Sequence, residues 1–104
     1  MNGGGLTAHE LALVCKELGR HPEVSEAVLF GSRAKGNHHP ASDVDLALSG
    51  ISDELTAAAI ADALENLPLP YRFDVKARDT LRYPPLLDHI ERVGVVIYRR
   101  EPKP

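Results

Sequence analysis

Two aspartates, Asp43 and Asp45, are the residues of this sequence best placed to do chemistry. They are separated by one residue at the start of a predicted strand, residues 43–48. On a strand, residues i and i+2 project from the same face, about 7 Å apart along the chain. Two carboxylates on one face repel each other unless a cation lies between them, and a divalent ion is the natural partner of carboxylate oxygens. The pair therefore predicts a site for one divalent ion, or for two ions about 3.5–4 Å apart.

A third carboxylate, Asp74, lies in the segment 71–76, where apolar and charged side chains alternate. Such alternation is typical of a half-buried strand. If this strand pairs with residues 43–48, Asp74 can join the same cluster. Arg72 and Lys76 share its face and are either charge partners of the carboxylates or contacts for a triphosphate.

A Gly-Ser turn, Gly31-Ser32, follows a short apolar run that reads as a buried strand, residues 27–30. Glycine lets the backbone turn where a side chain would block a close ligand. A short helix beginning at Ser32 would offer N–H groups to a phosphate, and Arg33 and Lys35 add positive charge. A phosphate cradle followed about a dozen residues later by paired carboxylates is typical of a nucleoside triphosphate site.

The elements that must position these residues are predicted from apolar spacing and capping signals. A capping box at 7–10 starts a helix that Gly19 would end as a left-handed cap. A helix starts at 52–54 and stops before Pro68; another runs over 84–93; and a last strand covers 95–98. The middle helix is expected to bury an apolar stripe made of Leu55, Ala58, Ala59, Ala63, Leu64 and Leu67. Strands and helices thus alternate, which predicts an α/β sheet with helices packed on it.

The chain length fits one domain over residues 1–104, and residues 1–6 and 99–104 are expected to be flexible. A net charge of −3 argues against a broad nucleic-acid-binding surface. The single cysteine, Cys15, lies in a helical apolar pattern and is expected to be a core residue of a protein from a reducing compartment. No leader pattern and no apolar run of about 18 residues is found, so we expect a cytoplasmic protein without membrane contact.

The histidines give a weaker signal than the carboxylates. His38 and His39 lie in the loop between the Gly-Ser turn and the aspartates, where they could touch phosphate or an acceptor, although exposed loop histidines are usually solvated. His9, His21 and His89 are scattered and fit no zinc spacing.

The segment Gly31-Ser32-Arg33-Ala34-Lys35-Gly36, followed after five residues by Ser42-Asp43-Val44-Asp45-Leu46, resembles a known signature. It is similar to the Gly-Ser-x-Ala-x-Gly and Ser-Asp-x-Asp-Leu motifs of the DNA polymerase β-like nucleotidyltransferase superfamily. More closely, the chain resembles the minimal, single-domain MNT-type members. Arg72-Phe73-Asp74-Val75 looks like the strand that carries the third carboxylate of that family. The resemblance implies an α/β (α+β) fold with a small mixed four-stranded sheet.

The resemblance also implies roles for individual residues. Gly31 and Ser32 would hold the β and γ phosphates of a nucleoside triphosphate, with Arg33 and Ser42 as further nucleotide contacts. The catalytic carboxylates Asp43, Asp45 and Asp74 would bind two Mg²⁺ ions, and Asp74 would also act on or orient the acceptor hydroxyl. A nucleoside monophosphate, AMP if the substrate is ATP, would be transferred with loss of pyrophosphate.

Minimal members of the family commonly pair with a small helical HEPN-type protein, which implies a toxin–antitoxin role for this chain. The antitoxin would transfer AMP to a tyrosine of the partner. Alternatively, it would be a catalytically silent nucleotide-binding and docking module that neutralises the partner by binding alone. A third possibility is a structural α/β domain with a fortuitous aspartate cluster. Larger relatives carry an extra helical domain for base and acceptor, so here a second chain would supply those contacts in a homo- or hetero-oligomer.

Overall fold

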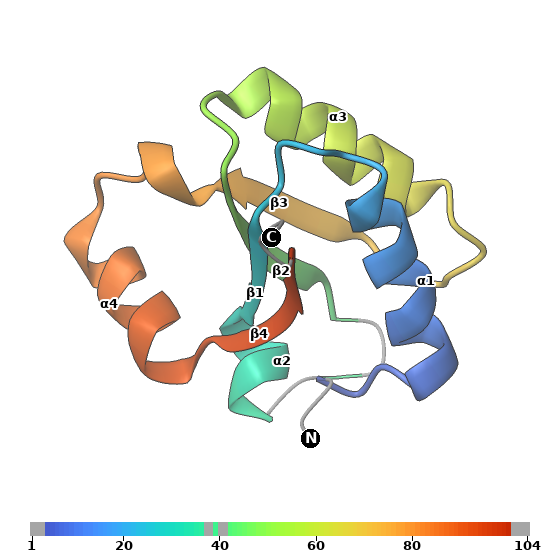
Figure 1. Ribbon diagram of the computed structural model, residues 1–104. Helices are drawn as coiled ribbons and strands as arrows, with labels where there is room; N and C mark the ends of the chain where they lie inside the picture. Colours follow the sequence, from blue (N-terminus) through green and yellow to red (C-terminus); the bar gives the residue numbers. More distant parts are fainter. Residues whose placement is uncertain (1–3, 37–38, 40–41, 101–104) are drawn as a thin grey trace.

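A mixed four-stranded sheet forms the centre of the computed structural model, which describes residues 4–36, 39 and 42–100 (Figure 1). Its strands are β1 (Glu26–Phe30), β2 (Val44–Ser49), β3 (Phe73–Ala77) and β4 (Val95–Arg99). They lie in the order β3-β2-β1-β4. β1 is antiparallel to both of its neighbours, and β2 is parallel to β3. The predicted mixed sheet is therefore confirmed.

Helices cover both faces of this sheet. They are α1 (Ala8–Gly19), α2 (Gly31–Lys35), α3 (Glu54–Glu65) and α4 (Pro84–Val93), with a short 3₁₀ turn at Arg78–Thr80. α1 and α3 pack on one face, and α4 lies on the opposite face (Figure 1). Among the described residues, no helix is both long and apolar enough to cross a membrane.

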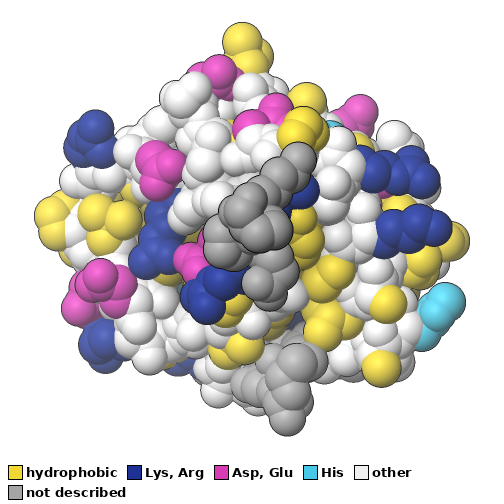
Figure 2. Space-filling model, in the orientation of Figure 1, with side chains coloured by type: hydrophobic (Ala, Val, Ile, Leu, Met, Phe, Trp, Pro, Cys, Tyr) yellow, Lys and Arg dark blue, Asp and Glu magenta, His cyan; other side chains and the backbone are white. Residues whose placement is uncertain are grey.

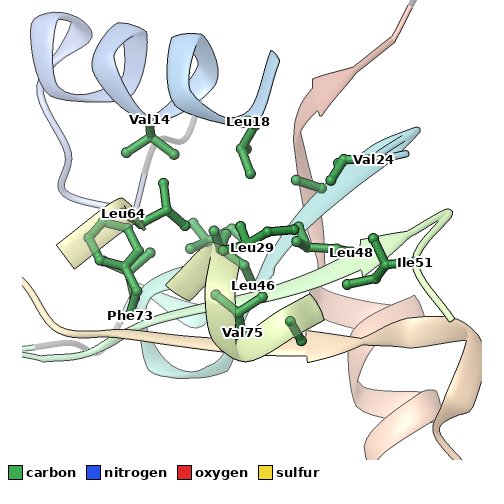
Figure 3. Close-up of a cluster of buried hydrophobic side chains, with 14 of the residues drawn as sticks. Val14, Leu18, Val24, Leu29, Leu46, Leu48, Ile51, Leu64, Phe73 and Val75 are labelled. Carbon is green, nitrogen blue, oxygen red and sulfur yellow. The ribbon is translucent and has the colours of Figure 1, made fainter. Parts of the chain in front are cut away.

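The main core lies between the sheet and the helices α1 and α3 (Figure 3). Leu18 of α1 packs there with Leu29 of β1 and Leu46 of β2, and each of these side chains is fully buried. Burial of one such leucine contributes about 1.5–3 kcal/mol. Because side chains alternate along a strand, the intervening residues face α4, where Phe30 packs against Ile90 in a smaller cluster. Asp45 and Asp74 alternate with core residues in the same way and so belong to the α4 face.

The capping box that starts α1 is confirmed, but the predicted left-handed cap at Gly19 is wrong. The Glu10 N–H donates to Thr7 Oγ1 (3.1 Å), and the Thr7 N–H donates to Glu10 Oε1 (3.0 Å). Gly19 is the last helical residue, and Arg20 follows with φ −78°, in the right-handed region. The N–H groups of Arg20 and His21 bond three residues back, so the helix ends in a tight right-handed turn.

The buried face of α3 differs from the predicted stripe. Ala57, Ile60 and Leu64 are buried, whereas Leu55 is 84% exposed. Ala58 and Ala59 are exposed as well. Alanines carry little information about orientation because they fit either face, and the larger Ile60 and Leu64 decide which side turns inward.

The chain ends depart from the expected flexibility wherever they are described. Leu6 belongs to the main core, and Arg99 is the last residue of β4. Arg100 donates hydrogen bonds to the carbonyl oxygens of Val24 (3.0 Å) and His21 (3.1 Å). Residues 4–6 and 99–100 are thus part of the packed domain, held by the apolar burial of Leu6 and by the hydrogen bonds of Arg100.

Cys15 lies at the edge of the main core, as expected for a structural thiol. Its Sγ contacts the carbonyl oxygen of Ile97 in β4 at 3.1 Å. Burial raises the pKa of the Cys15 thiol, which disfavours the reactive thiolate.

Candidate functional site

The three aspartates are brought to one end of the sheet by β2 and β3. Parallel pairing places Asp45 directly opposite Asp74, and Asp43 immediately precedes β2. The start of β2 is fixed by a hydrogen bond from the Val44 N–H to the carbonyl oxygen of Arg72 (2.8 Å). The conditional prediction that Asp74 would join the aspartate pair if the two strands were neighbours is met.

Electrostatics show that these carboxylates interact. The pKa of Asp45 is raised to about 6, first by burial and then by the negative charges of Asp74 and Asp43. Lys76 opposes this rise, and its Nζ lies 3.6 Å from Oδ1 of Asp74. Of the two roles left open for Lys76, the structure therefore shows that of a charge partner. Arg72 is exposed, and its role stays a prediction.

The chemistry of the donor set fits a divalent cation. Carboxylate oxygens are hard ligands, and the repulsion that raises the pKa of Asp45 is what a bound cation would relieve. Among the described residues, however, no three His, Cys, Asp or Glu side chains already form a group that could hold a metal ion. The carboxylates are thus neighbours in the fold, and a cation would have to draw them closer together.

Gly31 places the predicted phosphate cradle directly beside the carboxylates. β1 ends at Phe30, which pairs with Asp45, so the next residue turns over the Asp45 side chain. Gly31 has φ +77°, which L side chains rarely adopt, and a Cβ built on it would collide with Oδ2 of Asp45. Only glycine meets both conditions. Ser32 follows in the first turn of α2, so the two halves of the predicted site are adjacent.

His89 is a neighbour of the cradle that sequence reasoning missed. Its Nε2 accepts a hydrogen bond from the Gly31 N–H at 3.0 Å. Its ring also meets the ring of Phe30 edge to face, with centroids 6.1 Å apart. The two bonded residues are 58 positions apart, and only the packing of α4 on the sheet brings them together.

The predicted nucleotide contact Arg33 is wrong, because its side chain points into the protein and is 1% exposed. Nε and Nη2 donate to the carbonyl oxygen of Ser42 (3.1 and 2.9 Å), and Nη1 donates to that of Gly4 (2.6 Å). The guanidinium also lies 4.7 Å from the centre of the Tyr71 ring. Arg33 therefore ties the N-terminal segment to the backbone just before Asp43 and is not directed at a ligand.

Ser42 takes part in the same local structure. Its Oγ accepts a hydrogen bond from the His39 N–H (2.8 Å), and its own N–H donates to the His39 carbonyl oxygen (3.0 Å). The predicted nucleotide contact of Ser42 stays a prediction. His38 lies outside the described residues.

A cavity on the α4 face is lined by none of the carboxylates. It has a volume of about 350 Å³ and is lined by Glu26, Val28, Arg78, Ile90, Glu91, Gly94, Val96 and Arg99. Glu26 there pairs with Arg99 (2.6 Å) and Arg78 (3.7 Å). Figure 2 shows basic and acidic side chains gathered together between α4 and β4. None of the predicted site residues lines this cavity.

Comparison with known proteins supplies a family and a fold. The profile of the family described as polymerase beta, nucleotidyltransferase matches residues 14–103. A toxin–antitoxin structure with AMP-PNP has a chain 19% identical to this one, with a TM-score of 0.70, covering 92% of this chain and 76% of its own. No curated protein matches.

Two further solved structures are similar. One is a tri-AMPylated HEPN toxin of Shewanella oneidensis in complex with an MNT antitoxin. The matching chain is 18% identical to this one with a TM-score of 0.67, and the match covers 88% of this chain and 71% of that chain. The other is the toxin–antitoxin MntA–HepT. Its matching chain is 18% identical to this one with a TM-score of 0.68, and the match covers 90% of this chain and 74% of that chain. At these identities the likeness is one of fold.

Proposed function

The chain belongs to the polymerase beta nucleotidyltransferase family, and we propose that it is a Mg²⁺-dependent nucleotidyltransferase. It would transfer AMP from ATP to a hydroxyl of a small helical partner of the HEPN type and thereby act as an antitoxin. The observation that carries the proposal is the convergence of Gly31, Asp45 and Asp74 at one end of the sheet. Paired carboxylates beside a Gly-Ser turn are the arrangement that transfer from a metal-bound triphosphate uses.

In this proposal Asp43 and Asp45 hold Mg²⁺, and Asp74 shares in that task. When bound, the metal neutralises phosphate charge and makes the α-phosphorus easier to attack. The absence of a side chain at Gly31 leaves room for the Asp45 carboxylate, and Ser32 would contribute its amide and hydroxyl to the phosphates.

The transfer itself is a single displacement. The acceptor oxygen bonds to the α-phosphorus, the bond from that phosphorus to the bridging oxygen breaks, and pyrophosphate leaves with the electron pair. Asp74 would receive the acceptor proton, a role supported by its exposure at the edge strand β3. Asp45 is partly covered between Gly31 and β3, a position suited to holding the metal-bound phosphates.

A partner chain completes the site in this proposal. None of the carboxylates lines the cavity on the α4 face, and in this proposal the contacts to base and acceptor come from another molecule. The similar solved structures are toxin–antitoxin complexes, and one of them contains an AMPylated HEPN toxin. A tyrosine hydroxyl of a helical partner is therefore the acceptor we propose.

The test uses ATP labelled at the α-phosphorus, Mg²⁺ and the proposed small helical partner. We expect label on the partner with the wild-type chain and with Asp62→Asn, an exposed carboxylate of α3 that serves as the matched control. We expect none with Asp45→Asn. No label with the wild type would contradict the enzyme. If Asp45→Asn still neutralised the partner, the chain would act as a silent docking module.

A further inference from the structure

The Gly31 turn is held from two sides. On one side lies the Asp45 carboxylate, so close that no Cβ fits. On the other side the Gly31 N–H, the first amide of α2, donates to Nε2 of His89. Since an imidazole nitrogen accepts only through its lone pair, this hydrogen bond requires neutral His89 with its proton on Nδ1.

His89 is itself held in place. It lies on α4 next to Ile90, which is 2% exposed and packs in the smaller core cluster. Its ring stands nearly perpendicular to that of Phe30, at 81°, and Phe30 is the residue just before Gly31. The acceptor is therefore fixed to the same strand end whose turn it holds, which leaves the ring little freedom to swing away.

We propose that His89 is a positioning residue for the triphosphate. It acts through Gly31: by accepting from the Gly31 N–H it fixes the plane of the Phe30–Gly31 peptide, and so anchors the start of the turn that leads to Ser32 before nucleotide arrives. The Gly31 N–H is already occupied, so phosphate contacts fall to Ser32. The inference rests on the proposed function, since it assigns the residue that sets the geometry of that same phosphate site.

Two substitutions separate this role from simple packing. In His89→Phe the aromatic contact with Phe30 can be kept, but the acceptor for the Gly31 N–H is lost. In His89→Gln the ring is lost, but Oε1 extends about as far as Nε2 and can accept the same hydrogen bond. A positioning role predicts that Gln works better than Phe, and a packing role predicts the reverse order.

The experiment combines NMR of the free chain with kinetics of transfer from ATP to the partner. We expect the Gly31 amide proton resonance to move upfield in His89→Phe and to stay near its wild-type position in His89→Gln. We expect the KM for ATP to rise about five- to tenfold in His89→Phe with little change in kcat, as for the loss of one hydrogen bond that aids binding. In His89→Gln we expect the KM for ATP to stay close to the wild-type value.

The contrary results are distinct for the two proposals. If the wild type transfers AMP and His89→Phe has the same KM and the same Gly31 resonance, the positioning role is overturned while the enzyme stands. If His89→Gln is impaired and His89→Phe is not, the residue only packs. If the wild type neither binds nor uses ATP, the proposed function fails and this inference fails with it.

Discussion

Replacing Asp45 by asparagine should make the metal-free chain more stable at neutral pH. Most substitutions of a partly buried polar residue destabilise a protein, so this is an unusual expectation. It follows from the pKa of Asp45, which is raised from 3.8 to about 6 by burial and by the charges of Asp74 and Asp43. The folded chain thus disfavours the ionised carboxylate, and asparagine removes that charge with almost no change in shape.

The sign and size of the effect follow from linkage. Because the folded chain binds the proton more tightly, its free energy of unfolding falls as pH rises from about 4 to about 6 and then stays low. A shift of about two pKa units corresponds to about 3 kcal/mol for a fully buried group. The Asp45 carboxyl is only partly buried, so solvent screening reduces this penalty to about 1–2 kcal/mol. Asp45→Asn should be more stable by that amount.

The assay is urea unfolding in EDTA at pH 7.5 and again near pH 4, with Asp62→Asn as the control. We expect Asp45→Asn to gain about 1–2 kcal/mol at the higher pH and nothing near pH 4, where the wild-type carboxylate is itself protonated. The control should be unchanged at both values. Added Mg²⁺ should stabilise the wild type and not the variant. A variant that is no more stable than wild type at pH 7.5, or a gain that persists near pH 4, would refute the reasoning.

Three further predictions test the described contacts. Arg33→Lys loses the paired hydrogen bonds and should cost about 2–4 kcal/mol in urea unfolding; a loss below about 0.5 kcal/mol would contradict the buried role. Gly31→Ala and Gly36→Ala each add about 1–2 kcal/mol of backbone strain, because alanine would have to adopt the left-handed conformation. Only at Gly31 would the new Cβ also collide with the Asp45 carboxylate. Calorimetry should therefore show lost ATP binding for Gly31→Ala alone, and equal losses would contradict the crowding. Ile60→Ala should cost about 2–4 kcal/mol and Leu55→Ala less than about 0.5, measured by thermal unfolding; equal costs would contradict the buried face of α3.

Strand periodicity predicted which face of the sheet Asp45 and Asp74 share. The one-residue spacing of Asp43 and Asp45 put them on one face, and the alternation around Asp74 put it on the polar face of its strand. Gly31 was singled out as a turn residue, and its second role, making room for the Asp45 carboxylate, appears only once β1 and β2 are paired.

Other features depend on contacts that local sequence does not encode. Arg33 is basic and follows the Gly-Ser turn, so its charge suggested phosphate, yet its partners are backbone carbonyls at Gly4 and Ser42. Because every residue has a backbone carbonyl, the sequence does not indicate which carbonyl oxygens a buried arginine will contact. His89 reaches Gly31 only through the packing of α4 on the sheet, which no spacing rule predicts.

The central claim is that these carboxylates bind nucleotide through a divalent metal, and calorimetric titration with a non-hydrolysable ATP analogue tests it most directly. The wild-type chain, with its helical partner present, is titrated in Mg²⁺ and then in EDTA, beside Asp45→Asn and Asp62→Asn. We expect the wild type and Asp62→Asn to bind in Mg²⁺ but not in EDTA, and Asp45→Asn not to bind in either. Equal binding in EDTA, or undiminished binding by Asp45→Asn, would contradict it.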